Sequence, residues 1–286
     1  MVRFLSFAVA VLLGCLAGSS SMQEQRAEGN RVMLWLCLEF CSQDQQAISE
    51  NIAQIALNRD ALDAVSFEKY TLGPHSTLFD NDLTPVSKQI RALGLEAWPL
   101  LSSYPHPPEF MEWMREVFAH PEPFVAQCLE EAQKYGYVGY NLDWEPTEGV
   151  KEGDAAAYAA FIDTFASQLA TKGLQLSVDI ASWSEVWNYT AIAQTAAARA
   201  ISMGTYTSTD TSFTSQLNML VDAFGPIRSG VGLETVNASS GEPIPMSEVE
   251  WRFEQIRQSG AREVDIWSSP VPPLWWPLIR QYKQGK

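Results

Sequence analysis

The sequence predicts a single α/β domain with the (β/α)8 or TIM barrel fold. At 286 residues, with 46% hydrophobic and 19% charged content, the chain can bury a sizeable core. Eight apolar runs alternate with helical patterns from residue 31 onward, and this size and rhythm are typical of such a barrel. A doubly wound open sheet is the alternative, but no glycine-rich phosphate loop follows the first run. We therefore expect a closed barrel.

The predicted strands are apolar runs with little interruption, as expected for strands that are buried on both faces. They cover residues 31–40, 64–73, 95–104, 135–146, 174–183, 200–206, 230–235 and 262–269. Pro99 lies inside the third run, where it cannot donate a hydrogen bond to a neighbouring strand. A bulge or a shifted strand boundary is therefore expected near this residue.

The predicted helices lie between these strands and carry apolar residues at helical spacing. They cover residues 42–60, 85–93, 124–135, 154–172, about 190–199, 213–224 and 247–258, with a closing segment at 272–283. Thr84 and Asp154 are the expected caps of the helices that follow them. Residues 105–123 read as a long connection without a helix of its own.

The first thirty residues differ from the rest. Residues 1–21 hold one arginine, an apolar run and then small residues, which is the layout of a cleaved signal peptide, and the run is short for a membrane span. Residues 22–30 read as a polar tether. The stretch LLGC ending at Cys15 also fits a bacterial lipoprotein box, so a lipid anchor is the alternative. We expect a secreted or extracellular protein without a transmembrane segment, with a lysosomal or lipid-anchored location as alternatives.

Charge, cysteines and sequons limit the ligands and modifications that the chain could carry. The formal net charge of −15 argues against binding to nucleic acid. Cys37 and Cys41 could form a disulfide only if the chain turns between them, and the sequence leaves this open. Asn188 and Asn237 begin N-glycosylation sequons. Neither Cys128 nor the three histidines show the spacing of a metal site.

Carboxylates and aromatic rings dominate the ends of the predicted strands, where the chemistry of a barrel gathers. The last residues of the strands are Glu39, Tyr104, Glu145, Trp183, Tyr206, Glu234 and Trp267. Aromatic faces stack on the apolar sides of sugar rings, and carboxylates carry out the cleavage of glycosidic bonds. The strand ends therefore indicate a carbohydrate-active site, with Glu39, Trp183 and Glu234 as candidate sugar-binding residues.

The stretch YGYVGYNLDWEP, residues 135–146, ends in polar residues at every second position. Because alternate side chains of a strand face opposite sides, Asn141, Asp143 and Glu145 would share one face. A neighbouring carboxylate and partial burial raise the pKa of a glutamate, so Asp143 would keep Glu145 protonated as a general acid. A solvated edge strand is the alternative, which the apolar residues between them argue against.

The segment YVGYNLDWE resembles the signature of glycoside hydrolase family 18, the chitinases and their relatives, whose fourth strand reads Asp-Gly-x-Asp-x-Asp-x-Glu. GTYT at 204–207 is similar to the Met-x-Tyr-Asp of the family's sixth strand, and the last strand ends in Trp267, as the family's sugar-stacking tryptophan does. The resemblance implies a catalytic barrel over residues 31–286. It also implies retaining hydrolysis of β-linked N-acetylglucosamine in chitin, chito-oligosaccharides or the N-glycan core.

The resemblance further implies substrate-assisted catalysis, in which the 2-acetamido oxygen of the sugar attacks the anomeric carbon. Glu145 would protonate the leaving oxygen and later activate water. Asp143 would orient the acetamido N–H, Tyr206 would hold the acetamido carbonyl oxygen, and Trp267 would form the floor of the sugar site. Neither a cofactor nor a metal ion is implied.

Three positions depart from the family pattern. Val138 replaces the first aspartate of the signature, Asn141 the second, and Thr207 the aspartate after the tyrosine. Asn141 can donate a hydrogen bond to Asp143 but cannot share a proton with it, so a shifted pH optimum is expected. Asn141 is accordingly a candidate substrate-binding residue rather than an acid.

Two other functions stay open. A retaining β-glycosidase with two carboxylates would use Glu145 as acid/base and Glu234 as nucleophile, although Trp144 stands where such enzymes carry asparagine. A family 18-like lectin would bind N-acetylglucosamine polymers without cutting them, although such proteins usually lose the glutamate. Only residues 236–247 separate the seventh strand from its helix, which leaves no room for the insertion domain of many chitinases. A shallow, open groove suited to endo action is therefore expected.

Overall fold

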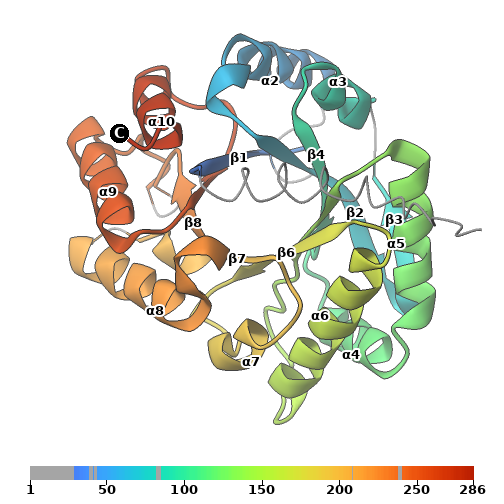
Figure 1. Ribbon diagram of the computed structural model, residues 1–286. Helices are drawn as coiled ribbons and strands as arrows, with labels where there is room; N and C mark the ends of the chain where they lie inside the picture. Colours follow the sequence, from blue (N-terminus) through green and yellow to red (C-terminus); the bar gives the residue numbers. More distant parts are fainter. Residues whose placement is uncertain (1–28, 39–40, 42–43, 82–84, 208, 238–239) are drawn as a thin grey trace, which may run out of the picture.

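The computed structural model describes residues 29–286, apart from 39–40, 42–43, 82–84, 208 and 238–239. Eight parallel strands form a closed barrel, since the sheet order β1-β9-β8-β7-β6-β5-β4-β2 is completed by pairing of β1 with β2. Figure 1 shows these strands at the centre and the helices around them. The strands are β1 (Arg31–Leu36), β2 (Ala64–Gly73), β4 (Glu96–Ser102), β5 (Gly139–Asp143), β6 (Gln175–Ile180), β7 (Arg199–Ser202), β8 (Ser229–Glu234) and β9 (Glu263–Trp267). The predicted TIM barrel is confirmed, and the open sheet is excluded.

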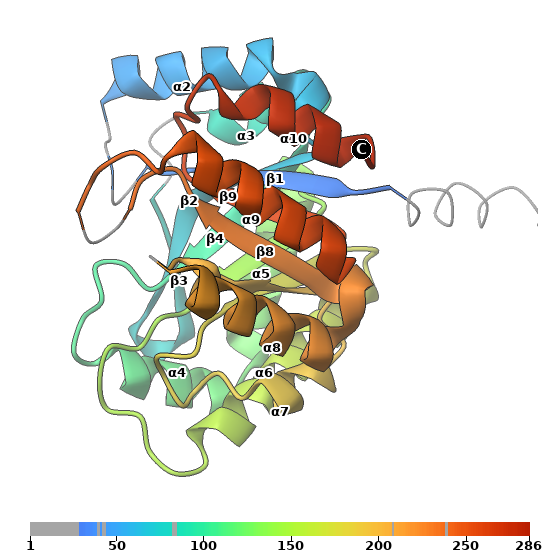
Figure 2. The same cartoon turned by 90° about the vertical axis from the view of Figure 1, so that its left-hand side faces the viewer.

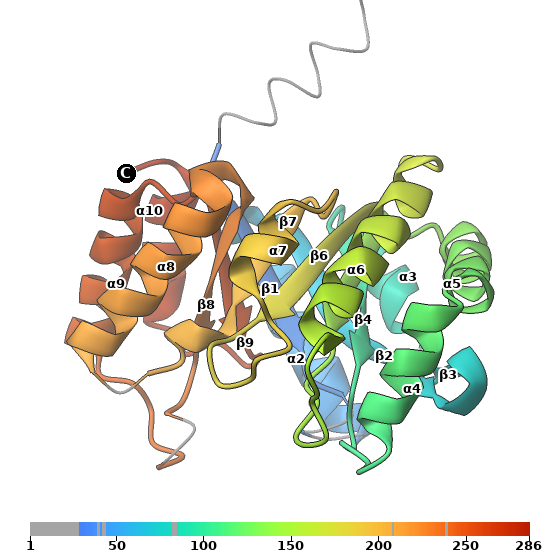
Figure 3. The ribbon, with the colours of Figure 1, turned by 90° about the horizontal axis from the view of Figure 1, so that it is seen from below.

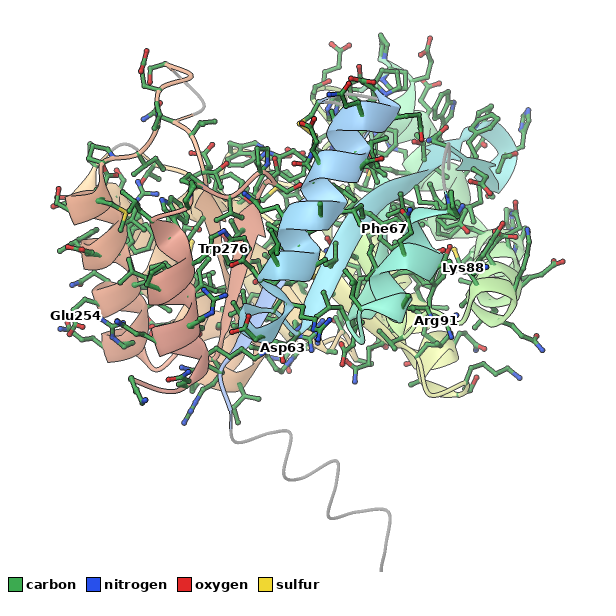
Figure 4. All side chains as sticks on the ribbon, turned by 90° about the horizontal axis from the view of Figure 1, so that it is seen from above. Asp63, Phe67, Lys88, Arg91, Glu254 and Trp276 are labelled. Carbon is green, nitrogen blue, oxygen red and sulfur yellow. A yellow bond between two sulfur atoms is a disulfide. The ribbon has the colours of Figure 1, made fainter. Side chains whose placement is uncertain are left out.

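The helices pack around the outside of the barrel. They are α2 (Gln45–Leu57), α3 (Val86–Ala92), α4 (Phe110–Ala119), α5 (Glu122–Tyr135), α6 (Asp154–Ala170), α7 (Tyr189–Ala193), α8 (Asp210–Arg228), α9 (Met246–Ser259) and α10 (Trp275–Lys283). Figure 4 labels Trp276, buried on α10, and Glu254, which points away from the barrel on α9. The closing segment therefore packs onto the barrel as predicted, through its tryptophan pair.

Two elements were not predicted. Helix α4 lies in the segment that the sequence analysis took for a connection, and it buries Phe110, Met111, Met114 and Val117. That spacing is helical, but the prolines on either side suggested a loop. Strand β3 (Thr77–Asp80) pairs antiparallel with the end of β2, outside the barrel. Neither addition changes the barrel itself.

Local predictions near helix starts need one correction. Asp154 is the first residue of α6 rather than its cap, because Gly153 occupies the cap position with φ 93°. The Asp154 carboxylate accepts a hydrogen bond from the Lys151 N–H at 2.7 Å and pairs with Arg115 at 2.6 Å. Thr84, the other expected cap, lies outside the described residues. Asp154 thus anchors the loop before α6.

The irregularity expected at Pro99 lies on the neighbouring strand. Pro99 stays in register opposite Phe67, and the register between β2 and β4 shifts after Glu68, so that Lys69 is the extra residue. Lys69 is fully buried and pairs with Asp80 at 2.7 Å. Phe67 is labelled in Figure 4. The bulge thus accommodates a strand proline without breaking the barrel.

The loops that follow the strands gather at one end of the barrel. In Figure 2 these loops extend to the left, and the opposite end holds the start of β1. Between β8 and α9 lie only residues 235–245, with a short bridge from Val236 to Pro243, so there is no inserted domain there. The single-domain prediction without an insertion domain is confirmed.

The remaining predictions concern the disulfide, the first residues of the chain and membrane-spanning segments. Cys37 and Cys41 form a disulfide with a Cα–Cα distance of 5.5 Å, and Cys128 is free and buried on α5. Residues 1–28 lie outside the described part, so the signal peptide, most of the tether and Cys15 are not placed. In the described part of the chain, no helix has the length and apolar character needed to cross a membrane.

Candidate active site

Strand β5 divides its side chains between the interior and the helical shell, as its alternation predicts. Asn141 and Asp143 face the interior, and Glu145 follows at the rim of a cavity. Trp144, between the two carboxyls, is fully buried in the shell and stacks on Phe161 with 5.1 Å between ring centroids. The anchored tryptophan fixes the backbone between the two acids, so both carboxyls reach the same mouth of the barrel.

Asn141 lies below that mouth and ties three other strands together. Its Oδ1 accepts hydrogen bonds from Trp35 Nε1 at 2.7 Å and from Ser66 Oγ at 3.2 Å. Its Nδ2 donates to Asp179 Oδ1 on β6 at 2.8 Å. The hydrogen bond expected with Asp143 is therefore replaced by one to Asp179. Asn141 is 0% exposed and is not one of the residues that line the cavity, so it lies beneath the site.

A cavity of about 310 Å³ opens at the carboxyl ends of the strands. It is lined by Trp35, Glu68, Ser102, Tyr104, His106, Asp143, Glu145, Asp179, Trp183, Met203, Tyr206 and Trp267. The five predicted residues Asp143, Glu145, Trp183, Tyr206 and Trp267 are thus brought together from four strands and their loops. Such a cavity can enclose a single sugar ring at the two acids.

Two predicted residues are placed elsewhere, and a third is not placed. Glu234 ends β8 and is buried, but it is not one of the described residues that line the cavity. Burial, then the charges of Asp179 and Glu234, raise the pKa of the Tyr206 phenol, so Glu234 lies near that side chain. Asn141 lies below the cavity floor. Glu39 falls outside the described residues.

The carboxyl groups of the cavity hold their protons more tightly than usual. Burial, then the charges of Glu145, Asp179 and Glu68, raise the pKa of Asp143 well above its ordinary value. Burial also raises the pKa of Glu145, and His106 opposes the shift. Burial likewise raises the pKa of Asp179. The cluster therefore keeps protons at a pH where isolated carboxyls would lose them, as a general acid requires.

One carboxyl oxygen is left for a ligand. Asp143 Oδ1 is buried and has no hydrogen-bond partner among the described residues. A buried acceptor without a partner is costly unless a bound group satisfies it. An N–H of a sugar substituent in the cavity can supply that partner.

Aromatic rings form the walls of the cavity. Trp35 and Trp267 meet edge to face with centroids 6.1 Å apart, and Tyr206 stands half-buried beside them. Trp183 is 57% exposed and contacts the ring of Trp187 at a centroid distance of 5.7 Å. Flat apolar faces beside carboxyl groups are the composition expected of a sugar-binding cavity.

Gly232 on β8 makes room for Tyr206. A Cβ at this position would lie 2.8 Å from the Tyr206 ring and 2.5 Å from the Ser202 carbonyl oxygen. We expect Gly232→Ala to lower the free energy of unfolding by about 1–3 kcal/mol and to reduce turnover by moving Tyr206. Urea unfolding together with kinetics checks this. Gly29→Ala, where nothing lies within 4 Å, should change neither.

Several cavity residues were missed by the sequence analysis. Trp35, Glu68 and Asp179 each lie within a predicted strand rather than at its end. The alternation of side chains along the strand could have indicated Glu68 and Asp179, because an acidic residue inside an apolar strand must face the barrel interior or find a partner. His106 follows β4, and its Nδ1 lies 3.3 Å from Ser103 Oγ, which accepts the Glu145 N–H at 3.1 Å. No sequence signal marked that link.

The two other departures from the family pattern lie outside the cavity. Val138 packs against an apolar layer in the barrel that includes Trp98 and Leu100. Thr207 is half-buried, and its carbonyl oxygen accepts a hydrogen bond from Arg252. Neither residue lines the space at the two acids. Among the described residues no group of three His, Cys, Asp or Glu side chains is placed to hold a metal ion.

Comparisons with known proteins identify the fold. No family model matches the sequence, and no curated protein matches it. The spore cortex-lytic enzyme SleL of Bacillus megaterium is similar in structure, with a TM-score of 0.73 and 13% identity over 88% of this chain and 74% of that one. A chitinase of Chromobacterium violaceum gives a TM-score of 0.72 and 14% identity over 88% and 98%. A class V chitinase of Nicotiana tobaccum in complex with NAG4 gives 0.66 and 9% over 90% and 98%.

These structures define the fold of the chain. Its barrel has the chitinase-like fold of glycoside hydrolase family 18, as the resemblance of the fourth strand implied. At this level of identity the likeness establishes the fold, and the activity rests on the residues of the site.

Proposed function

We propose that the protein is a retaining glycoside hydrolase that cleaves β-linked N-acetylglucosamine by substrate-assisted catalysis. The observation that carries the proposal is the pairing of Glu145 with Asp143 at the mouth of the barrel, where burial raises the pKa of both carboxyls. Tyr206 and Trp267 line the same cavity. Together they provide a proton donor, a partner for an acetamido N–H, and walls for a sugar ring.

In the first step, the acetamido oxygen bonds to the anomeric carbon while the glycosidic bond breaks and the leaving oxygen takes the proton of Glu145. Asp143 Oδ1 accepts the acetamido N–H, and the Tyr206 hydroxyl donates to the acetamido oxygen. In the second step, Glu145 takes a proton from water, which attacks the anomeric carbon and restores the acetamido group. Two inversions at that carbon give net retention.

The two-carboxylate alternative has weaker support. It needs a second carboxylate at the anomeric carbon as nucleophile, about 5–5.5 Å from the acid. Glu234, its candidate, does not line the cavity among the described residues. Asp143 does, but burial and its acidic neighbours raise the pKa of its carboxyl, which disfavours the ionised form that nucleophilic attack requires and suits a hydrogen-bonding role better.

The proposal is tested by comparing aryl N-acetyl-chito-oligosides with aryl cello-oligosides of equal length. We expect hydrolysis of the acetamido substrates alone, with the β-anomer as the first product seen by NMR. Equal cleavage of the plain glucoside would favour the two-carboxylate mechanism. Binding of chito-oligosaccharides without any cleavage would indicate a lectin.

We also infer secretion from the composition of residues 1–21 and from the disulfide between Cys37 and Cys41, because such bonds persist in oxidising compartments. The mass and N-terminal sequence of the protein recovered from the producing cells and their medium test this. A mature chain starting near residue 22 is expected, whereas lipidated Cys15 would support the anchored alternative.

A further inference from the structure

A second hollow adjoins the cavity on the far side of Glu145. It has a volume of about 620 Å³ and is lined by His106, Glu145, Pro146, Thr147, Glu148, Gly149, Val150, Trp183, Ser184 and Glu185. His106, Glu145 and Trp183 line both spaces, whereas Asp143, Tyr206 and Trp267 line the cavity alone. The two spaces therefore adjoin each other, with the acid at their junction.

Under the proposed function, a glycan bound across the two spaces can lie in only one direction. The sugar that supplies the acetamido group must lie with Asp143 and Tyr206 in the cavity. A general acid contacts the oxygen that leaves, so the leaving sugar lies beyond Glu145. The second hollow is thus the site for the leaving half of the glycan, and we call it the leaving-group groove.

The walls of the leaving-group groove are held in place by contacts with the rest of the protein. Its walls are the loops 144–153 and 181–188, which lie side by side in Figure 3. Arg115 on α4 fixes the first loop by donating to the Gly149 carbonyl oxygen and pairing with Asp154. Trp187 holds the second, because it is buried and its ring meets that of Trp183 at an interplanar angle of 88°.

Apart from His106, the ionisable side chains that line this groove are acidic. Glu148 and Glu185 face it from the two loops, are exposed, and make no ion pair with any described residue. Lys151, close to Glu148 in the sequence, lines a different hollow, and Arg115 is engaged by Asp154. An occupant with a cationic group and a flat apolar face would satisfy both the carboxylates and Trp183.

We propose that the leaving-group groove selects glucosamine, the sugar with a free protonated amine, so that the substrate is partially deacetylated chitin cut between N-acetylglucosamine and glucosamine. The acetamido group is needed only on the sugar in the cavity, where it is the nucleophile. On the leaving side, an ammonium at the same ring position meets the two carboxylates. This proposal rests on the proposed function. It adds a preference for glucosamine on the leaving side of the cleaved glycosidic bond.

The test uses partially acetylated chitosan of known random composition, digested by the full chain at mildly acidic pH, where the amine is protonated. Mass spectrometry of end-labelled products identifies the sugar on each side of every cut bond. We expect N-acetylglucosamine at the new reducing ends, and about two- to fivefold enrichment of glucosamine at the new non-reducing ends over random composition. The enrichment should fall as salt is added, because exposed charges are screened.

The paired variant Glu148→Gln with Glu185→Gln should return the new non-reducing ends to random composition. The matched variant Glu130→Gln with Glu250→Gln removes the same charge from exposed positions on α5 and α9, and it should keep the enrichment. Random ends in the unmodified protein, or full enrichment in the groove variant, would overturn the groove preference and leave the proposed function intact. Reducing ends that carry glucosamine, or a lack of cleavage, would instead overturn the proposed function.

Discussion

Replacing Glu145 by glutamine is expected to lower kcat/KM on chito-oligosaccharides by at least about 100-fold, the scale of general acid catalysis. Glutamine keeps the size and the hydrogen-bonding shape of the side chain but cannot give a proton to the leaving oxygen. Burial raises the pKa of Glu145, so its carboxyl keeps its proton to a higher pH than an exposed glutamate does. Steady-state kinetics on the free oligosaccharide measure the loss.

The leaving group distinguishes an acid from a merely structural residue. A dinitrophenyl substrate needs little protonation to depart, so Glu145→Gln should lose much less in its first step, seen as a burst of phenol. Glu250→Gln, an exposed change on α9, is the control for net charge and should behave as the unmodified protein. An equal loss on both substrates would remove Glu145 from the role of acid.

Asp143→Asn is expected to change activity and stability in opposite directions. Activity should fall by about 100- to 1,000-fold, because a preorganised carboxyl acceptor that can take up negative charge as the acetamido group reacts is replaced by an amide that cannot. The free energy of unfolding should rise by about 1 kcal/mol or more near neutral pH, because a buried ionisable group is removed. A purely structural role for Asp143 would lower both quantities together.

The sign of the stability change follows from the pKa. Burial and the acidic neighbours raise the pKa of Asp143 in the folded chain, whereas the unfolded value is about 3.9. The contribution of this group to stability is complete below the unfolded value and is lost as the pH rises through the folded one. Asparagine does not titrate, so the gain should be small at about pH 4 and larger at about pH 8 in urea unfolding. Asp222→Asn, exposed on α8, should show no such trend.

Much of the barrel could be predicted because parallel strands buried on both faces leave long apolar runs. Each of the eight predicted runs overlaps a strand of the barrel, and only β7 and β8 begin one residue before their runs. Helix α4 was missed because its flanking prolines resemble a loop, while its buried face is made of large residues at helical spacing. The bulge at Lys69 could not be located, since it lies on β2, whereas the proline that indicated an irregularity stands on β4.

The site was predicted where alternation and strand ends carry the information, as for Asp143, Glu145 and Trp267. It was not predicted where the partner comes from a distant strand. Asp179 lies 38 residues from Asn141 along the chain, and only closure of the barrel brings their side chains to 2.8 Å. The placement of Asn141 beneath the cavity likewise depends on Trp35, which lies three strands away on β1. Such pairings leave no pattern in a single sequence.

The hydrogen bond between Asn141 and Asp179 makes the chemistry depend on how two strands are aligned. Asn141 stands opposite Ser177 in the pairing of β5 with β6. A slip of one residue would turn Asp179 into the helical shell and leave a carboxyl among aromatic rings. The proposed glycosidase activity would therefore report correct strand alignment, so during refolding we expect far-UV ellipticity to return before that activity does.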